Sequence, residues 1–290
     1  MSVDVLVAGL LAGGLYALVG LGLSLVFGVL RLMNLAHGEL LVGGAFVASL
    51  LVGHLSLDPL VALPFAMVAV GAVAYLVQRL LLTGLLRMSS TAPLVATFGL
   101  SLVAQAGLQA GFGPDYRSLN ASYATTGFDV LGVRVQTIYA ISFAISVALT
   151  LVTHVVLTRT RAGSAVRAAA ADARTASLLG IDVGRVYALT FAGAAALAAA
   201  GGVLTGVAQS FSPTSGQPLL LVGFAVMALG GIGGVGGVLA GGLALGLAQS
   251  MAVSLFGGGY RNAVVYIAFL LVIAFRPASF RSLRLRGARA

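Results

Sequence analysis

Long apolar runs alternate with short polar segments along nearly the whole chain. Val186 to Tyr260 carries no charged residue over 75 positions, and Ile138 to Leu157 carries no formal charge at neutral pH. An α-helix needs about 20 apolar residues to cross a bilayer, and these runs reach that length. The pattern therefore predicts an all-α, polytopic membrane helix bundle of about eight or nine transmembrane helices.

The apolar runs and the turn residues between them locate the crossings. The predicted helices are Val5–Leu30, a second helix ending near Gly53, Leu60–Leu82, Leu94–Phe112, Thr137–Leu157, Val186–Val207 and a short last helix, Asn262–Phe275. Leu219 to Phe256 is long enough for two thin crossings or for a hairpin with a re-entrant break. Both alternatives return the chain to the same side before the last helix.

One charged segment, Arg159 to Arg185, interrupts the apolar pattern. It holds five of the sixteen arginines and two of the seven acids, so it is expected in water at a membrane surface. Its alanines favour a helix over Ala165–Leu179, with Ser164 as N-cap and Gly180 as a left-handed stop. Small residues share one predicted face of that helix: Val166, Ala169, Ala170, Ala173 and Ser177. Arg167 and Arg174 share another, and the small face suits a groove on a partner, although a plain solvated helix is the alternative.

The charges follow the distribution of a membrane protein. Composition is 60% apolar and 8% charged, against about a quarter charged in soluble domains. If the charged segment is cytoplasmic, thirteen arginines and three acids fall inside, and three arginines and four acids fall outside. This positive-inside bias places the N-terminus outside and the C-terminus, with Arg276, Arg281, Arg284, Arg286 and Arg289, in the cytoplasm. Membrane topology explains the net charge of +9, and nucleic acid is not needed as a partner.

Polar residues inside apolar runs mark candidate sites. Asn34, His37, Gly38 and Glu39 precede the second helix, where Glu39 is expected at the inner boundary, either starting that helix or taking a larger structural role. Thr97, Ser101, Gln105 and Gln109 recur every four residues on the Leu94–Phe112 helix. Lipid offers these side chains no hydrogen-bond partners, so they are expected to bond a neighbouring helix or to line a pathway.

Two further features concern packing and the outer loop. Glycines spaced by four are expected to let helices approach closely: Gly9 and Gly13 in the first helix, and Gly233, Gly237 and Gly241 in the Gly-rich run. Gly113 to Gln136 is the longest outer loop. Its mixed charges and tyrosines suit either an extracytoplasmic protein or a plain interfacial loop.

Several chemistries are excluded by what the chain lacks. It has no cysteine, and its three histidines lie on separate segments, so no metal site is expected. It has no lysine for a Walker A loop, so any ATP must bind to another polypeptide. Gly231 to Gly236 matches G-x-G-x-x-G formally, but no acid follows Asp182. The chain is therefore not expected to be an enzyme or to hold a cofactor of its own.

Three stretches carry a resemblance to a known family. GLYALVGLGLSLVFGVLRLMNLAHGELLVGGAF, from Gly14 to Phe46, resembles the opening of branched-chain amino-acid ABC transporter permeases of LivH type. AAAADARTASLLGID, with Asp172 eight residues before Gly180, resembles the cytoplasmic coupling segment of ABC-importer permeases. The third stretch is the Gly-rich run ALGGIGGVGGVLAGG, from Ala228 to Gly242.

The resemblance implies a function and a set of partners. Residues 1–290 would form a single transmembrane permease domain, with residues 159–185 as its coupling segment. The resemblance implies transport of a branched-chain amino acid, with a second permease subunit, two ATPase subunits and an extracytoplasmic binding protein, in the bacterial plasma (inner) membrane. It also implies a role in coupling to the ATPases for Arg167, Ala170, Asp172, Arg174 and Gly180. For the Asn34–Glu39 motif it favours a structural or gating role at the inner mouth.

Two alternatives remain open at this stage. Within the same family, urea or short amides are the alternative to branched-chain amino acids as the transported substrate. An ion-coupled secondary transporter that works alone is disfavoured because such proteins keep buried acids near the midplane, and every acid here falls in a loop or at a boundary in the predicted topology.

Overall fold

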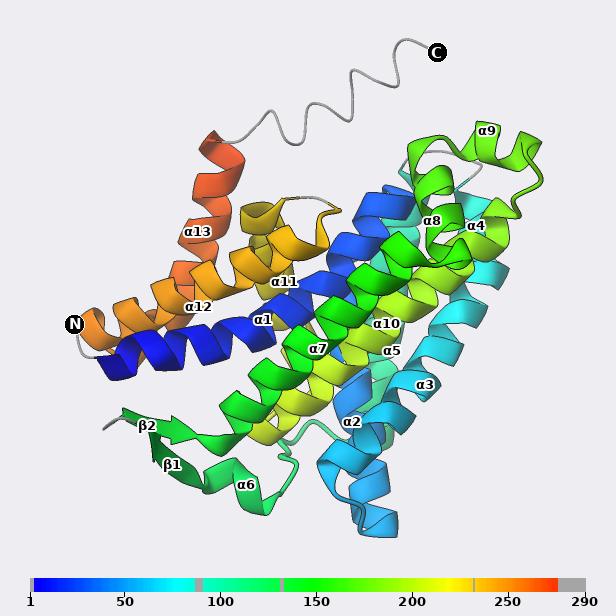
Figure 1. The fold of residues 1–290 in the computed structure, drawn as a ribbon. Helices are drawn as coiled ribbons and strands as arrows, with labels where there is room; N and C mark the ends of the chain where they lie inside the picture. Colours follow the sequence, from blue (N-terminus) through cyan, green and yellow to red (C-terminus); the bar gives the residue numbers. More distant parts are fainter. Residues whose placement is uncertain (1–2, 87–90, 131–132, 232, 276–290) are drawn as a thin grey trace.

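The computed structural model describes residues 3–86, 91–130, 133–231 and 233–275, which fold into a helix bundle with one small hairpin (Figure 1). The helices are α1 Val3–Leu30, α2 His37–Leu55, α3 Pro59–Val77, α4 Thr83–Leu85, α5 Ala92–Phe112, α6 Ser122–Thr125, α7 Thr137–Arg159, α8 Arg161–Ala171, α9 Ala173–Leu178, α10 Val183–Ala208, α11 Gly216–Gly230, α12 Val235–Phe256 and α13 Arg261–Phe275. A π-helical turn, Gln78–Leu82, joins α3 to α4, and the 3₁₀ turns Pro213–Ser215 and Gly258–Tyr260 precede α11 and α13. Strand β1 Gly127–Val130 pairs antiparallel with β2 Val133–Gln136.

Within the described residues, eight helical stretches are long and apolar enough to cross a membrane. Six are α1, α2, α5, α7, α10 and α12, and the other two are Pro59–Leu85 and Pro213–Gly230. Helix α13 is also apolar but has only 15 residues. The predicted all-α polytopic bundle is confirmed.

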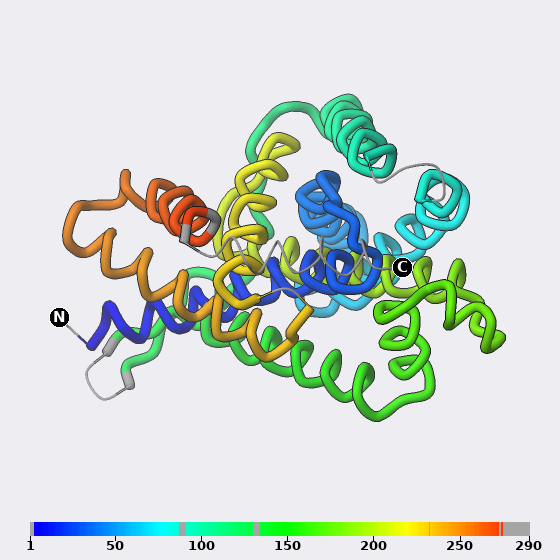
Figure 2. Tube along the Cα trace, turned by 90° about the horizontal axis from the view of Figure 1, so that it is seen from above, coloured from blue at the N-terminus to red at the C-terminus, as the bar shows by residue number. Residues whose placement is uncertain are grey.

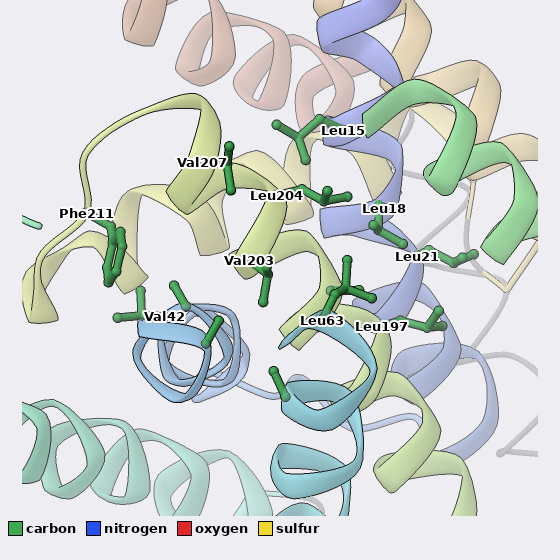
Figure 3. Close-up of a cluster of buried hydrophobic side chains, with 14 of the residues drawn as sticks. Leu15, Leu18, Leu21, Val42, Leu63, Leu197, Val203, Leu204, Val207 and Phe211 are labelled. Carbon is green, nitrogen blue, oxygen red and sulfur yellow. The ribbon is translucent and has the colours of Figure 1, made fainter. Parts of the chain in front are cut away.

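The centre of the bundle is built on α10, which packs against α1, α2 and α3. Its buried alanines keep its surface smooth, and two glycines bring the backbones of α2 and α10 together: Gly44 lies on Ala199, and Gly202 lies on Leu41. Small residues allow this approach where hydrophobic burial cannot drive association between helices in lipid. Larger side chains from α1, α2, α3 and α10 then fill one shared apolar cluster, part of which Figure 3 shows.

A second close contact joins α1 to α12, which lie side by side in Figures 1 and 2. A Cβ on Gly9 would lie 2.9 Å from the Leu247 Cα, and one on Gly13 would lie 2.7 Å from the Leu243 Cα. Both glycines therefore sit where a side chain would force the two helices apart.

The Gly-rich region forms two helices, α11 and α12, joined by a short turn. Helices α11 and α12 pack against each other, and the turn between them contains Gly231 and Gly233 with φ of +87° and +78°. Gly233 lies before α12, which starts at Val235, so it does not share a helix with Gly237 and Gly241; it lies instead against Gly28 of α1. Gly237 lies against the backbone of Gly230, and a Cβ on Gly241 would lie 2.6 Å from the Val226 carbonyl oxygen.

The two ends of the bundle differ in structure. One end carries α8 and α9, and we refer to it as the charged end; the opposite end carries α6 and the β1–β2 hairpin (Figure 1). At the opposite end the Tyr123 hydroxyl donates a hydrogen bond to Asp58 Oδ1 (2.7 Å), and Arg117 pairs with Phe211 through backbone hydrogen bonds of 2.8 Å. The predicted outer loop thus contains regular structure. Arg87 and the five arginines from Arg276 to Arg289 lie outside the described residues.

Candidate functional site

The charged segment forms two helices instead of the single helix predicted over Ala165–Leu179. Thr160, rather than Ser164, is the N-cap of α8, and its hydroxyl oxygen accepts a hydrogen bond from the Gly163 N–H (3.0 Å). Asp172 breaks the helix with φ of −153° and ψ of 106° and then caps α9. Its Oδ1 accepts hydrogen bonds from the N–H groups of Arg174 (2.9 Å) and Thr175 (3.2 Å). An aspartate competes with the helix for local hydrogen bonds, which explains the break.

Helix α9 ends at the predicted glycine. Gly180 has φ of +83°, and the Ile181 N–H donates to the Ala176 carbonyl at 3.1 Å. This is the arrangement of a Schellman stop, which requires a residue in the left-handed region. The N-cap at Asp172 and the stop at Gly180 together fix α9 as a short rigid unit.

The small-residue face of α8 packs on its own bundle. Ala169 is buried, while Val166 and Ala170 are half-buried against the apolar cluster formed by the inner parts of α1, α3 and α10. The prediction that this face is presented to a partner groove is therefore wrong for α8. A displacement of α8 would press directly on α1 and α10, which it contacts.

The surface that α8 and α9 leave open is different from the predicted one. Arg167 and Arg174 are exposed, and the side chains of Leu178 and Leu179 are 80% and 76% exposed. Leu178 ends α9 and Leu179 is its C-cap, four and five residues after Arg174. We call Arg167, Arg174, Leu178 and Leu179 the α8–α9 surface.

A cavity of about 550 Å³ separates the corner between α8 and α9 from the end of α1. Its lining includes Arg31, Asp172 and Tyr187. Arg31 has φ of +53°, in the left-handed region that non-glycine residues seldom occupy, where α1 stops and the chain turns back into the bundle.

That turn places the Asn34–Glu39 motif inside the bundle, not at its boundary. Asn34, His37 and Glu39 are 0%, 0% and 4% exposed. The Val19 carbonyl, well within α1, accepts a hydrogen bond from His37 Nε2 (3.2 Å), which fixes the ring proton on that nitrogen. The predicted boundary position of Glu39 is therefore wrong, and so is the argument that no acid lies within the bundle.

Each of these three side chains leaves one polar atom without a partner among the described residues: Asn34 Nδ2, His37 Nδ1 and Glu39 Oε2. A buried polar atom without a partner costs on the order of 1–3 kcal/mol. Three such atoms occur within the six residues from Asn34 to Glu39, so this motif is costly to bury.

Glu39 connects three helices. Its Oε1 accepts a hydrogen bond from the Ser101 hydroxyl of α5 at 3.4 Å. The same carboxylate covers Gly216, the first residue of α11, where a Cβ would lie 2.5 Å from Oε1. Gly38 also packs on Gly216 through backbone contact. The start of α2, the start of α11 and the middle of α5 therefore meet at one point. We call Asn34, His37, Glu39, Ser101 and Gly216 the buried polar cluster.

The predicted polar stripe on α5 divides into two parts. Thr97 and Ser101 are buried, whereas Gln105 is half-buried and Gln109 is exposed. The Thr97 hydroxyl donates to the Met33 carbonyl and its oxygen accepts from the Leu35 N–H, both at 3.3 Å. Otherwise α5 lies at the edge of the bundle (Figure 2), with Pro93 as its third buried residue.

Three hydroxyl side chains on α7 are buried, and the sequence patterns above did not predict them as site residues. Ser142, Ser146 and Thr150 are 0%, 0% and 5% exposed, and their hydroxyl oxygens have no hydrogen-bond partner among the described residues. They follow the same four-residue spacing as the α5 stripe, and that spacing is the sequence signal by which they could have been predicted.

The side chain of Gln78 is also buried without a hydrogen-bond partner among the described residues. No group of three or more potential metal-ligating side chains occurs in the described part of the chain.

Comparison with known proteins gives matches along most of the chain. A family profile described as "Branched-chain amino acid transport system / permease component" matches residues 5–274. The chain is 30% identical over 289 residues to the high-affinity branched-chain amino acid transport system permease protein BraD of Pseudomonas aeruginosa, covering 94% of this chain and 93% of that protein. It is 29% identical to LivH of Escherichia coli, with 93% and 92% covered, and 26% identical to the probable LivH of Methanocaldococcus jannaschii, with 93% and 88% covered.

A solved structure shares the fold at low sequence identity. PsaBC from Streptococcus pneumoniae, in complex with Fab, superposes with a TM-score of 0.51 at 16% identity, covering 98% of this chain and 94% of that one. This likeness concerns the arrangement of the helices alone.

Proposed function

Because this chain belongs to the family of branched-chain amino acid transport permease components, we propose that it is the membrane-spanning subunit of an ABC importer for branched-chain amino acids. The observation that carries this proposal is the family match over residues 5–274, together with 30% identity to BraD over 94% of the chain. An importer of this kind implies ATPase subunits and a substrate-binding protein as partners. The chain carries eight helical stretches suited to crossing a membrane and has no lysine for an ATP site of its own.

The ATPase subunits dock, in this proposal, on the α8–α9 surface at the cytoplasmic end. Leu178 and Leu179 would enter an apolar groove, and Arg167 and Arg174 would contact its rim. Asp172 and Gly180 act through the shape of α9, which they start and stop, and Ala170 acts by seating α8 on the bundle. Movement of an ATPase would then push α8 against α1 and α10.

The buried polar cluster is the gate in this mechanism. Glu39 joins the starts of α2 and α11 to α5, so a shift of α1 or α10 that separates them would break the Ser101 hydrogen bond and uncover the Gly216 contact. The unpartnered atoms of Asn34, His37 and Glu39 would gain water or new partners in that open state. This supports a gating role for the motif rather than permanent ligation of the cargo.

A second permease subunit completes the pathway, along the open side of α5. Gln105 and Gln109 lie on that helix beyond its buried part, where lipid would leave their amides unpaired. The two subunits would face each other across these residues.

Family membership implies the bacterial plasma (inner) membrane, and charge indicates the orientation. We place α8 and α9 in the cytoplasm, because that end of the bundle gathers Arg31, Arg159, Arg161, Arg167, Arg174 and Arg185. A binding protein would approach the opposite end, over α6 and the β1–β2 hairpin.

The partners and the cargo are tested together by ATP hydrolysis. The chain would be purified with the ATPases and the permease encoded beside it, and hydrolysis measured after adding the corresponding binding protein loaded with leucine or with urea. We expect stimulation by the leucine-loaded protein. Stimulation by the urea-loaded protein instead would support urea as the cargo. The absence of any ATPase in the purified complex would contradict the proposal itself.

A further inference from the structure

A cavity of about 330 Å³ opens at the end of the bundle opposite α8 and α9. Four parts of the chain surround it: the first half of α1, the end of the hairpin with the start of α7, the second half of α12 and the start of α13. Two arginines from distant parts of the sequence meet there, Arg134 on β2 and Arg261 at the start of α13.

The cavity carries positive charge without a compensating acid. No aspartate or glutamate is among its lining residues. Asp129 stands opposite Arg134 in the hairpin register, yet among the described residues neither Arg134 nor Arg261 forms an ion pair or a side-chain hydrogen bond. Gln249, 4% exposed, donates from Nε2 to the Arg261 backbone carbonyl at 3.0 Å and so holds the start of α13 in place.

A third arginine at the same end provides a contrast. The Arg117 guanidinium donates to the Phe112 carbonyl at 2.7 Å and lies 5.5 Å from the Phe112 ring centroid. One Arg117 donor is thus used within the fold, whereas the side chains of Arg134 and Arg261 make no hydrogen bond among the described residues and are available to a ligand.

Much of the remaining lining is apolar, and Gln136, Gln249 and Ser250 also line the cavity. Val7, Ala8, Leu11 and Ala12 of α1 form one side, and Tyr16 and Tyr139 stand beside them. Tyrosines are enriched where hydrocarbon meets the headgroup region, and guanidinium groups pair with phosphate through two parallel hydrogen bonds. A ligand that fits both walls has an anionic head attached to hydrocarbon.

We propose that this cavity binds an anionic phospholipid of the outer leaflet. Its phosphate lies between the guanidinium groups of Arg134 and Arg261, and one acyl chain runs along the small and apolar side chains of α1. The bound lipid would tie the hairpin and α13, which pack on different helices, to the outer end of α1. The proposal requires the chain to span a membrane and does not depend on which cargo it transports.

Lipid retention measured by native mass spectrometry tests the proposal. The full-length chain, with any subunits that copurify, would be exchanged into detergent and mixed with phosphatidylglycerol, phosphatidylcholine or inorganic phosphate. We expect phosphatidylglycerol to be retained over phosphatidylcholine, with retention falling about fivefold for each of Arg134→Gln and Arg261→Gln, as about 1 kcal/mol per arginine implies. Arg117→Gln is the matched control and should retain the lipid as the unchanged chain does.

Two further arms separate the alternatives. Ala8→Phe fills the apolar wall and leaves both arginines in place, so it should lower lipid retention even if an arginine variant folds poorly. Competition by inorganic phosphate at equal concentration would overturn the lipid assignment in favour of a free anion. Equal retention of both lipids would also overturn it, as would unchanged retention in the double arginine variant.

Discussion

Single glycines decide how closely the helices of this bundle approach. Gly43 and Gly44 are neighbours on α2, but a Cβ on Gly43 would meet nothing within 4 Å, whereas one on Gly44 would collide with the backbone of Ala199. The pair separates the two effects of a Gly→Ala change, which are the gain in helix propensity and the loss of close packing.

We expect Gly44→Ala to lower the melting temperature of the purified chain, because α2 must move away from α10. Gly43→Ala should leave it unchanged or raise it, since alanine is favoured over glycine in a helix interior by roughly 0.5–1 kcal/mol. Thermal unfolding followed by circular dichroism in detergent measures both. Equal effects of the two variants would contradict the packing described for α2 and α10.

Gly216 provides the corresponding test for the buried polar cluster. Gly216→Ala places a Cβ 2.5 Å from Glu39 Oε1, so the carboxylate must leave its position over α11 and lose the Ser101 hydroxyl. We expect transport by the assembled complex to fall severalfold while the chain still folds. Gly193→Ala on α10, where a Cβ meets nothing within 4 Å, is the control and should transport normally.

Among the elements, α9 depends most on one side chain. Asp172→Ala removes both caps of the Arg174 and Thr175 N–H groups, so amide hydrogen exchange over residues 174–178 should become faster. Asp172→Asn keeps a capping oxygen but loses the carboxylate charge, so exchange should be slower than in Asp172→Ala and faster than in the unchanged chain. Equal loss of protection in both variants would mean that the charge of Asp172, not its hydrogen-bonding geometry, holds α9.

The pH dependence of this cap has a defined sign. The Thr175 hydroxyl, together with the Thr175 and Arg174 N–H groups, holds the pKa of the Asp172 carboxyl below its usual value. A carboxyl with a lowered folded-state pKa contributes stability above the unfolded value of about 3.9 and loses it as pH falls through the folded value. Once intrinsic exchange rates are corrected for, the protection of α9 should therefore be flat from about pH 8 to about pH 5 and should fall only below about pH 4. A decline between pH 8 and pH 6 would contradict this assignment.

The α8–α9 surface can be tested without disturbing the bundle. Leu178→Ala with Leu179→Ala removes two side chains that are 80% and 76% exposed, so thermal stability should not change, while copurification of the ATPases should drop. Leu255→Ala, at the opposite end of the bundle and 71% exposed, should retain the ATPases. If the ATPases copurify with the double variant as they do with the unchanged chain, the docking surface lies elsewhere.

The sequence predicted elements better than it predicted their ends and surroundings. The apolar runs located the crossings, and the left-handed stop at Gly180 was predicted in place because glycine signals it locally. The break at Asp172 was missed because the alanine-rich flanks have high helix propensity on both sides, and a single capping aspartate outweighed them. The burial of Glu39 was missed because it depends on the reversal at Arg31, a tertiary feature with no local signal in the sequence.

Across the whole molecule, the separation of its two ends follows from charge and apolar length, both of which are readable from sequence. The meeting of α2, α5 and α11 at Glu39 is not readable, since these helices lie far apart in the chain and join through side-chain contacts. A buried acid at this point would also suit an ion-coupled transporter. Family membership, and not the position of the acids, therefore carries the assignment to an ATP-driven importer.

ATP-dependent uptake tests that assignment most directly. Proteoliposomes containing this chain, its partner permease and the ATPases would be given the loaded binding protein outside, with radiolabelled leucine, and with or without ATP inside. We predict accumulation that requires internal ATP and persists when ionophores collapse every ion gradient. Leucine uptake by the chain without ATPases, driven by a proton or sodium gradient, would contradict the account.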